Sequence, residues 1–296
     1  WQREQGLAID GNVLVDSIEG LELVDEIVLV DQSPIGKTPR GNPATYTKVF
    51  DRIRKLFAAT DEAREAGFDA GCFSFNVEGG RCEECKGAGM IQVEMQFLSD
   101  VTLSCESCDG RRFRREVLGI RYRERNIHEV LQLTIDDAVL FFSHEEKLAA
   151  TLAFLSSLGL GYLRLGQPIN TLSGGEAQRL KLAARVLRAR RGGRLLFLLD
   201  EPTTGLHLED IRKLLDVLHG LIDRGHGVVM IEHQVDVLAQ ADHLIDLGPE
   251  GGDGGGRLVA SGAPEDVAAA GDSITASWIG AALDTARRRT SKPRRR

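Results

Sequence analysis

The amino-acid sequence predicts an α/β protein with a doubly wound sheet and an inserted cysteine-rich module. Short apolar runs alternate with amphipathic helical segments, as strands and helices do in such sheets. One run, Leu195–Leu199, is apolar at every position, which is typical of a central parallel strand covered on both faces. Between residues 72 and 125, glycine, cysteine and charged residues dominate instead. This change of pattern predicts the inserted module.

The composition disfavours membrane and secreted proteins. The chain has 296 residues, 42% of them hydrophobic and 27% charged, which suits about two domains or one large α/β domain with an insertion. No apolar run approaches the roughly 20 residues of a membrane-spanning helix, and no signal peptide opens the chain. Because the first residue is Trp1, we expect the natural start to lie upstream.

The net charge of -7 is unevenly distributed. Residues 287–296 carry seven positive charges and no acid, which leaves -14 on residues 1–286. A basic tail on an acidic body is expected to be disordered. This tail either binds a polyanion or only aids solubility.

In the first half of the chain, we expect a strand at Ile27–Val30, an apolar run closed by Asp31. Asn42 followed by Pro43 predicts a helix start, since proline suits the first helical position after a capping residue. A strand-like segment follows at Ile91–Phe97 within the cysteine-rich stretch. Helical patterns return at residue 126.

Two capping boxes predict further helices: Ser143 with Glu146, and Ser173 with Glu176. Gly159 is expected to end the first of them. Their apolar faces are Leu148, Leu152 and Leu155, and Ala177, Leu180, Ala184 and Leu187. After the central strand we expect a helix over residues 211–221 and strands at Val228–Ile231 and Leu244–Leu247.

Two adjacent carboxylates, Asp200 and Glu201, follow the apolar run Leu195–Leu199. In a parallel sheet they would lie at the carboxyl edge, where α/β folds bind ligands. In phosphoryl transfer, one acid suits a magnesium shell and the next suits polarising a water. The alternative is that these acids cap the next helix.

Residues 172–176 read LSGGE, with Gly174 and Gly175 directly after the N-cap Ser173. Backbone N–H groups exposed at a helix N-terminus bind phosphate readily, and an ordinary capped helix is the alternative. His233 follows a predicted strand, and a histidine there is more often structural.

Gln32 after a strand, LSGGE, Asp200-Glu201 and His233 occur in one order. They resemble the Q-loop, signature, Walker B and switch histidine of ABC-type ATPases, over residues from about 27 to 262. The resemblance implies an ABC-type nucleotide-binding domain that uses ATP and Mg²⁺.

The resemblance also implies roles for these residues. Asp200 would hold magnesium through water, and Glu201 would polarise the attacking water. His233 would contact the γ-phosphate, and Gln32 would sense the metal and the water. The signature residues would close over ATP held by an opposing module's phosphate loop: Ser173, Gly174, Gly175 and Glu176.

Gly36-Lys37-Thr38 is not expected to be a phosphate loop. The first glycine of that motif would fall at Asp31, whose carboxylate would repel phosphates, and Pro39 disfavours helix at Thr38. In ABC ATPases the loop precedes the Q-loop. We therefore expect it upstream of Trp1, and we expect this chain alone to be inactive.

Four cysteines form two CxxC pairs separated by nineteen residues: Cys82, Cys85, Cys105 and Cys108. Two such pairs suit a tetrahedral, structural zinc site, and free thiols are the alternative. Cys72 lies outside this spacing and is expected to be buried packing. Four arginines directly after the second pair suit DNA phosphates: Arg111, Arg112, Arg114 and Arg115. A solvated charged face is the alternative.

The zinc insertion between Q-loop and signature narrows the resemblance. Residues 31–40, 42–46 (NPATY) and 73–76 (FSFN), with the CxxC pairs, resemble the UvrA family, the damage-recognition ATPases of bacterial nucleotide excision repair. The likeness extends to Leu283 and concerns the C-terminal ATPase half. It implies a cytoplasmic homodimer of the SOS response that binds damaged double-stranded DNA and loads a UvrB-like partner.

The resemblance divides the chain into five parts. These are the start of the ATPase lobe (1–71), the zinc module (72–125), the helical signature region (126–192), the ATPase core (193–283) and the basic tail (284–296). Two alternatives remain open. One is a UvrA-like paralogue in drug self-resistance, and the other is a non-catalytic, zinc-dependent DNA-binding fragment.

Overall fold

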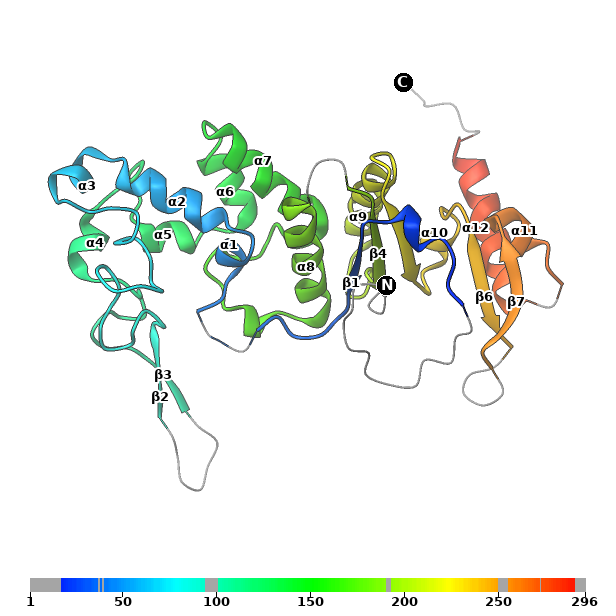
Figure 1. The fold of residues 1–296 in the computed structure, drawn as a ribbon, viewed down its shortest axis with the longest axis horizontal. Helices are drawn as coiled ribbons and strands as arrows, with labels where there is room; N and C mark the ends of the chain where they lie inside the picture. Colours follow the sequence, from blue (N-terminus) through cyan, green and yellow to red (C-terminus); the bar gives the residue numbers. More distant parts are fainter. Residues whose placement is uncertain are drawn as a thin grey trace. The chain divides into compact units, whose positions relative to one another are not determined.

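A computed structural model describes residues 17–36, 38, 40–93, 101–189, 193–249, 255–271 and 273–290 (Figure 1). The chain divides into two compact units. The first unit runs to Leu199 and includes Thr204–Val229. The second joins Asp200–Thr203 to the chain from Met230 onward.

The sheet of the first unit is parallel where β1 (Glu26–Val30) pairs with β4 (Leu195–Asp200), with Val28 opposite Phe197. The strand order is β1-β4-β5, so β4 is the central strand, and β5 spans Gly227–Ile231. Side chains at alternate positions of β4 are buried, and Phe197 is fully enclosed. The structure thus confirms the apolar run as a central strand.

Helices form much of the rest of the first unit. Each of the longer ones buries an apolar face, as α9 does with Ile211, Leu214 and Leu218. The helical elements are η1 (Leu21–Leu23), α1 (Pro43–Tyr46), α2 (Val49–Ala58), α3 (Asp61–Glu65), α4 (Arg115–Gly119), α5 (Ile127–Leu131), α6 (Ile135–Phe141), α7 (Glu146–Leu155), η2 (Ser156–Leu160), η3 (Ile169–Thr171), α8 (Gly174–Arg188) and α9 (Leu208–Ile222).

The predicted helix starts have different outcomes. Asn42 caps α1 as expected, and Ser173 caps α8 through a reciprocal box with Glu176. The box predicted for Ser143 with Glu146 is wrong, because α7 starts at Glu146 with Glu145 as its N-cap and has no side-chain cap. A turn precedes α7, in which the amide of Glu145 donates to the carbonyl of Phe142 at 2.8 Å.

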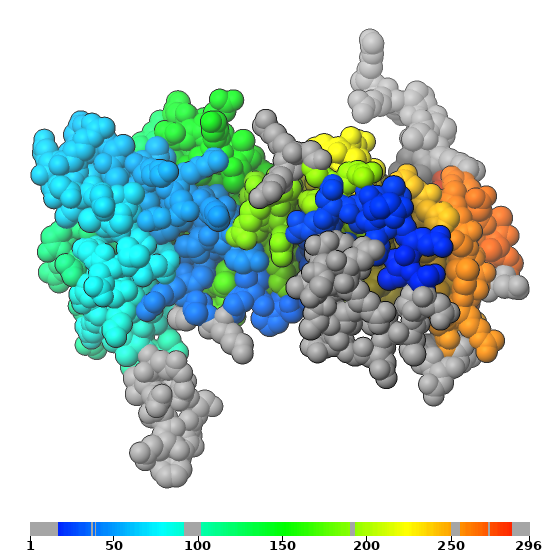
Figure 2. Space-filling model, viewed as in Figure 1, coloured from blue at the N-terminus to red at the C-terminus, as the bar shows by residue number. Residues whose placement is uncertain are grey.

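The cysteine-rich stretch folds around an antiparallel hairpin of β2 (Met90–Val93) and β3 (Val101–Ser104), which extends away from the helices of its unit in Figure 1. The strand expected at Ile91–Phe97 thus begins as predicted, and residues 94–97 lie outside the described residues. Phe75 joins this stretch to α2, because its ring stacks on Phe50 at 5.0 Å. Figure 2 shows the stretch in cyan beside the lighter blue of α2 and α3.

The second unit holds a separate antiparallel pair of strands, β6 (Leu244–Gly248) and β7 (Arg257–Gly262). The strand predicted at residues 244–247 therefore exists, but within the described part of the chain it pairs with β7 alone rather than extending the parallel sheet. The unit also contains α10 (Val235–Leu238), α11 (Pro264–Ala268) and α12 (Ile274–Thr290).

Helix α12 continues through residues 284–290, for which the sequence predicts a disordered tail. Alanines at 281, 282 and 286 favour helix, and positive charge is favourable near a helix C-terminus. Residues 291–296 lie outside the described residues. No helix in the part of the chain described is long and apolar enough to cross a membrane.

Candidate functional site

The four cysteines of the CxxC pairs meet in one buried cluster. Their sulfurs all lie within 4.8 Å of one another, with Cys82 Sγ 3.9 Å from Cys105 Sγ and Cys85 Sγ 3.7 Å from Cys108 Sγ. Zinc–sulfur bonds of about 2.3 Å in a tetrahedron require sulfurs about 3.8 Å apart. The cluster therefore has the ligand set and the spacing to hold one zinc ion.

The backbone around the cluster suits thiolates. The amide of Gly89 donates to Cys85 Sγ at 3.2 Å. Gly87 has a φ of 80°, and a Cβ there would lie 1.9 Å from the carbonyl oxygen of Phe75, so the turn after the first pair requires glycine. Burial raises the pKa of the Cys85 and Cys108 thiols, because a thiolate without a cation is poorly solvated there. A bound metal reverses that preference.

The four arginines after the second CxxC pair differ in exposure. Arg111 and Arg114 are exposed and lie near carboxylates, 3.5 Å from Asp109 and 2.6 Å from Glu83 respectively. Arg115 is exposed at the first position of α4. Arg112 is only 9% exposed, so its guanidinium does not contribute to a solvent-facing basic surface.

The signature segment forms the N-terminus of α8. Ser173 N donates to Glu176 Oε2 at 2.6 Å, and Glu176 N donates to Ser173 Oγ at 3.3 Å. Tyr162 adds a hydrogen bond from its hydroxyl to Glu176 Oε1 at 2.5 Å. Burial acts to raise the pKa of Glu176, but the hydrogen bonds from Tyr162 and Ser173 hold that pKa below its ordinary value. The capping carboxylate is thus kept charged.

The same helix lies against the loop after β1. A Cβ built on Gly174 would lie 3.3 Å from Gln32 Oε1, so the structure brings the predicted Q-loop glutamine and the signature glycines together. The buried Gln178 side chain donates from Nε2 to the carbonyl of Val30 at 3.0 Å. Lys37 and Pro39, from the segment that resembles the end of a phosphate loop, lie outside the described residues.

Lys181 is a site residue that the sequence pattern did not reveal. Its ammonium donates to Asp31 Oδ1 at 2.5 Å and to Ser33 Oγ at 2.6 Å, across 150 positions of the sequence for Asp31. The hydrogen bonds from Lys181 and Ser33 lower the pKa of Asp31 to about 2. The sequence did contain a signal for this contact. Gln178 and Lys181 are polar residues three positions apart, so they lie on the same side of α8.

In the second unit, Glu201 and His233 meet. His233 Nε2 lies 3.1 Å from Glu201 Oε1, and both side chains are accessible to solvent. Glu201 has a φ of 47°, a conformation that is uncommon for residues other than glycine, and its amide donates to the carbonyl of Ile231. Such backbone strain persists where the surroundings hold it, and it is frequent at functional sites.

Glu232 is a second residue that the sequence pattern did not reveal. Its two carboxylate oxygens accept hydrogen bonds from the amide and the hydroxyl of Thr203, at 3.0 and 2.9 Å. Thr203 follows Glu201 by two residues, and Glu232 precedes His233. This contact therefore joins the two segments that carry Glu201 and His233. Asp200 lies next to Glu201 at the end of β4 and is exposed.

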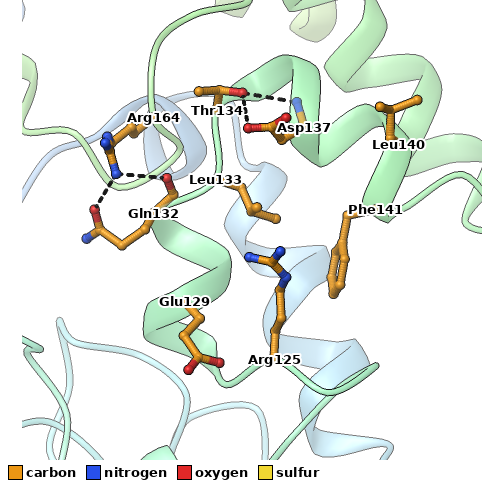
Figure 3. A pocket seen from close by; sticks show the side chains of 9 residues that line it. All are labelled: Arg125, Glu129, Gln132, Leu133, Thr134, Asp137, Leu140, Phe141 and Arg164. Carbon is orange, nitrogen blue, oxygen red and sulfur yellow. Dashed lines mark hydrogen bonds between the residues drawn. The ribbon is translucent and has the colours of Figure 1, made fainter.

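A surface hollow of about 580 Å³ lies among α5, α6 and the loop before η3 (Figure 3). Its polar groups largely contact one another, since Thr134 bonds Asp137 at 2.7 Å and Arg164 bonds the Gln132 side chain at 3.2 Å. Arg125 lies over the ring of Phe141, 5.8 Å from its centre. The hollow holds none of the predicted site residues.

Proteins that share one name match most of this chain. UvrABC system protein A of Micrococcus luteus is 58% identical over 263 residues, and that of Methanothermobacter thermautotrophicus is 59% identical over 254 residues. These matches cover 89% and 86% of this chain, which spans 26% of each relative's length. No protein-family model matches the chain.

A solved structure has the same fold over most of this chain. The crystal structure of UvrA2 from Deinococcus radiodurans superposes with a TM-score of 0.81 at 51% identity. The match covers 88% of this chain and 32% of that one.

Proposed function

Because the chain belongs to the UvrA family, we propose that it forms part of an ABC-type ATPase that recognises damaged DNA in nucleotide excision repair. The proposal combines two sites, one for ATP and one for DNA. The observation that carries the ATP site is the pairing of Glu201 with His233 at 3.1 Å, at the ends of two strands. The buried four-cysteine cluster beside exposed arginines supports the DNA site.

For ATP, we assign the reacting end of the site to the second unit. Asp200 would hold Mg²⁺, Glu201 would polarise the attacking water and His233 would contact the γ-phosphate. A carboxylate within hydrogen-bond reach of an imidazole suits this task, because the pair can orient a water and accommodate its proton. Glu232 acts as a positioning residue through Thr203.

We assign to the first unit a surface that closes over ATP bound elsewhere in the assembly. Ser173, Gly174 and Gly175 present amides at the N-terminus of α8, with Glu176 held charged in their capping box. Gln32 lies against Gly174, and it would sense the metal and the water there. These residues close over ATP held by the phosphate loop of an opposing module, which agrees with assembly as a homodimer and with the larger size of the relatives.

For DNA, we assign affinity to the zinc-bound module and its exposed arginines. Arg111, Arg114 and Arg115 are the arginines of this cluster that can reach phosphates. Double-stranded, damaged DNA is the expected ligand, and a UvrB-like protein is the expected partner loaded onto it. The chain by itself is expected to bind DNA but not to turn over ATP.

The experiment uses a full-length protein that contains this chain, because the chain spans 26% of the length of its relative from Micrococcus luteus. Glu201→Gln should lower ATP turnover by at least about 100-fold while ATP binding persists, because a general base is removed without altering shape. Glu209→Gln, on the exposed first turn of α9, is the matched control and should keep the wild-type rate. Undiminished turnover in Glu201→Gln would contradict the assigned role.

A further inference from the structure

Arg112 is a buried cation within the cysteine-rich module. Its side chain is 9% exposed, and its Nη1 is buried without a hydrogen-bond partner among the described residues. Its backbone has a φ of 74°, a conformation that residues other than glycine adopt at some cost. Burying a charged guanidinium costs free energy, so another interaction in the module must offset that cost.

The aromatic ring beneath Arg112 supplies only part of that compensation. The guanidinium carbon lies 5.2 Å from the centre of the Phe75 ring, a cation–π contact. Within the residues that the structure describes, no carboxylate forms an ion pair with Arg112, although Arg111 and Arg114 each have one nearby. A buried guanidinium without an opposite charge is strongly unfavourable.

The opposite charge available to Arg112 is that of the cysteine sulfurs. Burial lowers the pKa of Arg112, and negative charge on Cys85 and Cys108 acts in the opposite direction. Residues 111–112 join the two CxxC pairs, because the amide of Arg111 donates to the carbonyl of Cys108 at 2.8 Å and the carbonyl of Arg112 accepts from the amide of Cys82 at 2.9 Å. The Arg112 backbone is thus held beside both halves of the ligand set.

Four thiolates around one Zn²⁺ leave a net charge of about -2 on the cluster. Here that charge lies in a buried environment, with Ala88 and Ile91 packed against the cysteines. Hydrogen bonds from backbone amides such as that of Gly89 offset part of it. A guanidinium buried in the same module offsets more, because Coulomb attraction is strong where water is excluded.

We propose that Arg112 is the buried counter-ion of the zinc–thiolate cluster and positions its two CxxC pairs, rather than a contact to DNA phosphate. The proposal rests on the zinc site proposed above. It also explains the burial of Arg112. A bound metal keeps the cysteines deprotonated, so the guanidinium has an opposite charge nearby. Without the metal it would be an isolated buried charge.

The test measures zinc affinity on the 296-residue chain by competition with a chelator. Arg112→Met keeps length and apolar contact but removes the charge, and it should bind zinc about 10- to 100-fold more weakly, as variants without an outer-shell partner do. Arg112→Lys keeps the charge and should lie between Arg112→Met and the wild type. Arg111→Met, one residue away but exposed, is the matched control and should bind zinc as the wild type does.

A second readout uses Co²⁺ in place of zinc, because its sulfur-to-metal charge-transfer band reports on the electrostatics of the thiolates. Removing a nearby positive charge raises the energy of the sulfur electrons, so the band of Arg112→Met should move to longer wavelength. The band arises only from the metal-loaded fraction. It therefore tests the charge even if Arg112→Met folds less completely.

The possible outcomes separate the two proposals. A wild-type chain that binds no zinc would overturn the zinc site and the counter-ion role together. Zinc in the wild type, with Arg112→Met equally tight or with an unmoved cobalt band, would overturn the counter-ion role alone. Equal weakening in Arg112→Met and Arg112→Lys would also overturn it, because the shape of arginine and not its charge would then matter.

Discussion

The two candidate sites of this chain are built in opposite ways. The metal site is buried, and all four of its ligands come from one stretch of sequence, Cys82 to Cys108. The residues proposed for ATP extend in the sequence from Gln32 to His233, and the His233 side chain is 77% exposed. A site made from one stretch can be complete within this chain. A site made from exposed groups that are distant in the sequence depends on further residues or modules of the protein to complete it.

The largest expected effect tests whether the metal site is self-contained. Cys105→Ser should lose the roughly one equivalent of zinc that the chain is expected to bind, and residues 77–125 should exchange their amide hydrogens much faster. Structural zinc supplies folding free energy of order 10 kcal/mol in small zinc modules. Metal analysis and hydrogen exchange are the measurements.

Cys72→Ser is the matched control for that experiment. Cys72 is a free, half-buried thiol outside the cluster, so its replacement should leave the zinc content unchanged. Loss of zinc in both variants, or in neither, would contradict the claim that the four clustered cysteines alone hold the metal.

The next effect concerns DNA and sharpens the contrast between buried and exposed arginines. Replacing Arg114 and Arg115 together with Ala should weaken binding to double-stranded DNA several-fold and flatten its dependence on salt, by about 0.9 in the logarithmic slope for each phosphate that is no longer neutralised. Fluorescence anisotropy at several salt concentrations measures both quantities. Arg212→Ala, an exposed arginine on α9, should change neither. An unchanged slope in the double variant would remove these arginines from the interface.

A smaller effect distinguishes a helix cap that forms from one that does not. Ser173→Ala should lower the free energy of unfolding by about 1 kcal/mol, because the amide of Glu176 loses its acceptor. Ser143→Ala removes the serine of the box that the structure lacks, and its effect should be close to zero. Denaturant titration compares the two. Equal decreases would show that the start of α7 differs from the one described.

The smallest effect depends on pH and tests the contact between α8 and the loop after β1. Asp31 has a folded-state pKa of about 2, below its ordinary value of 3.8, because of Lys181 and Ser33. A lowered pKa stabilises the folded state above the ordinary value, and that contribution disappears as the pH falls through the folded value. The melting temperature of Lys181→Met should therefore lie below that of the wild type at pH 5 and approach it near pH 2. A constant difference would mean that the ion pair does not act through Asp31.

Much of this protein could be predicted because the deciding interactions are local. The zinc ligands follow from two cysteines in one tight turn, repeated once. The cap of α8 follows from Ser173 and Glu176, three residues apart, whose hydrogen bonds do not depend on distant segments. The central strand follows from five consecutive apolar residues in β4, whose side chains are buried or half-buried in alternation.

Other features were decided by tertiary structure, because they depend on which distant groups share a volume. Arg112 is one of four similar arginines in sequence, and only its burial against Phe75 inside the module separates it from its exposed neighbours. Lys181 contacts Asp31 only because α8 packs beside β1, and Glu201 contacts His233 only because the ends of two strands lie together. Local hydrogen bonds are specified by spacing along the chain, whereas burial and charge pairing are specified by the fold that encloses them.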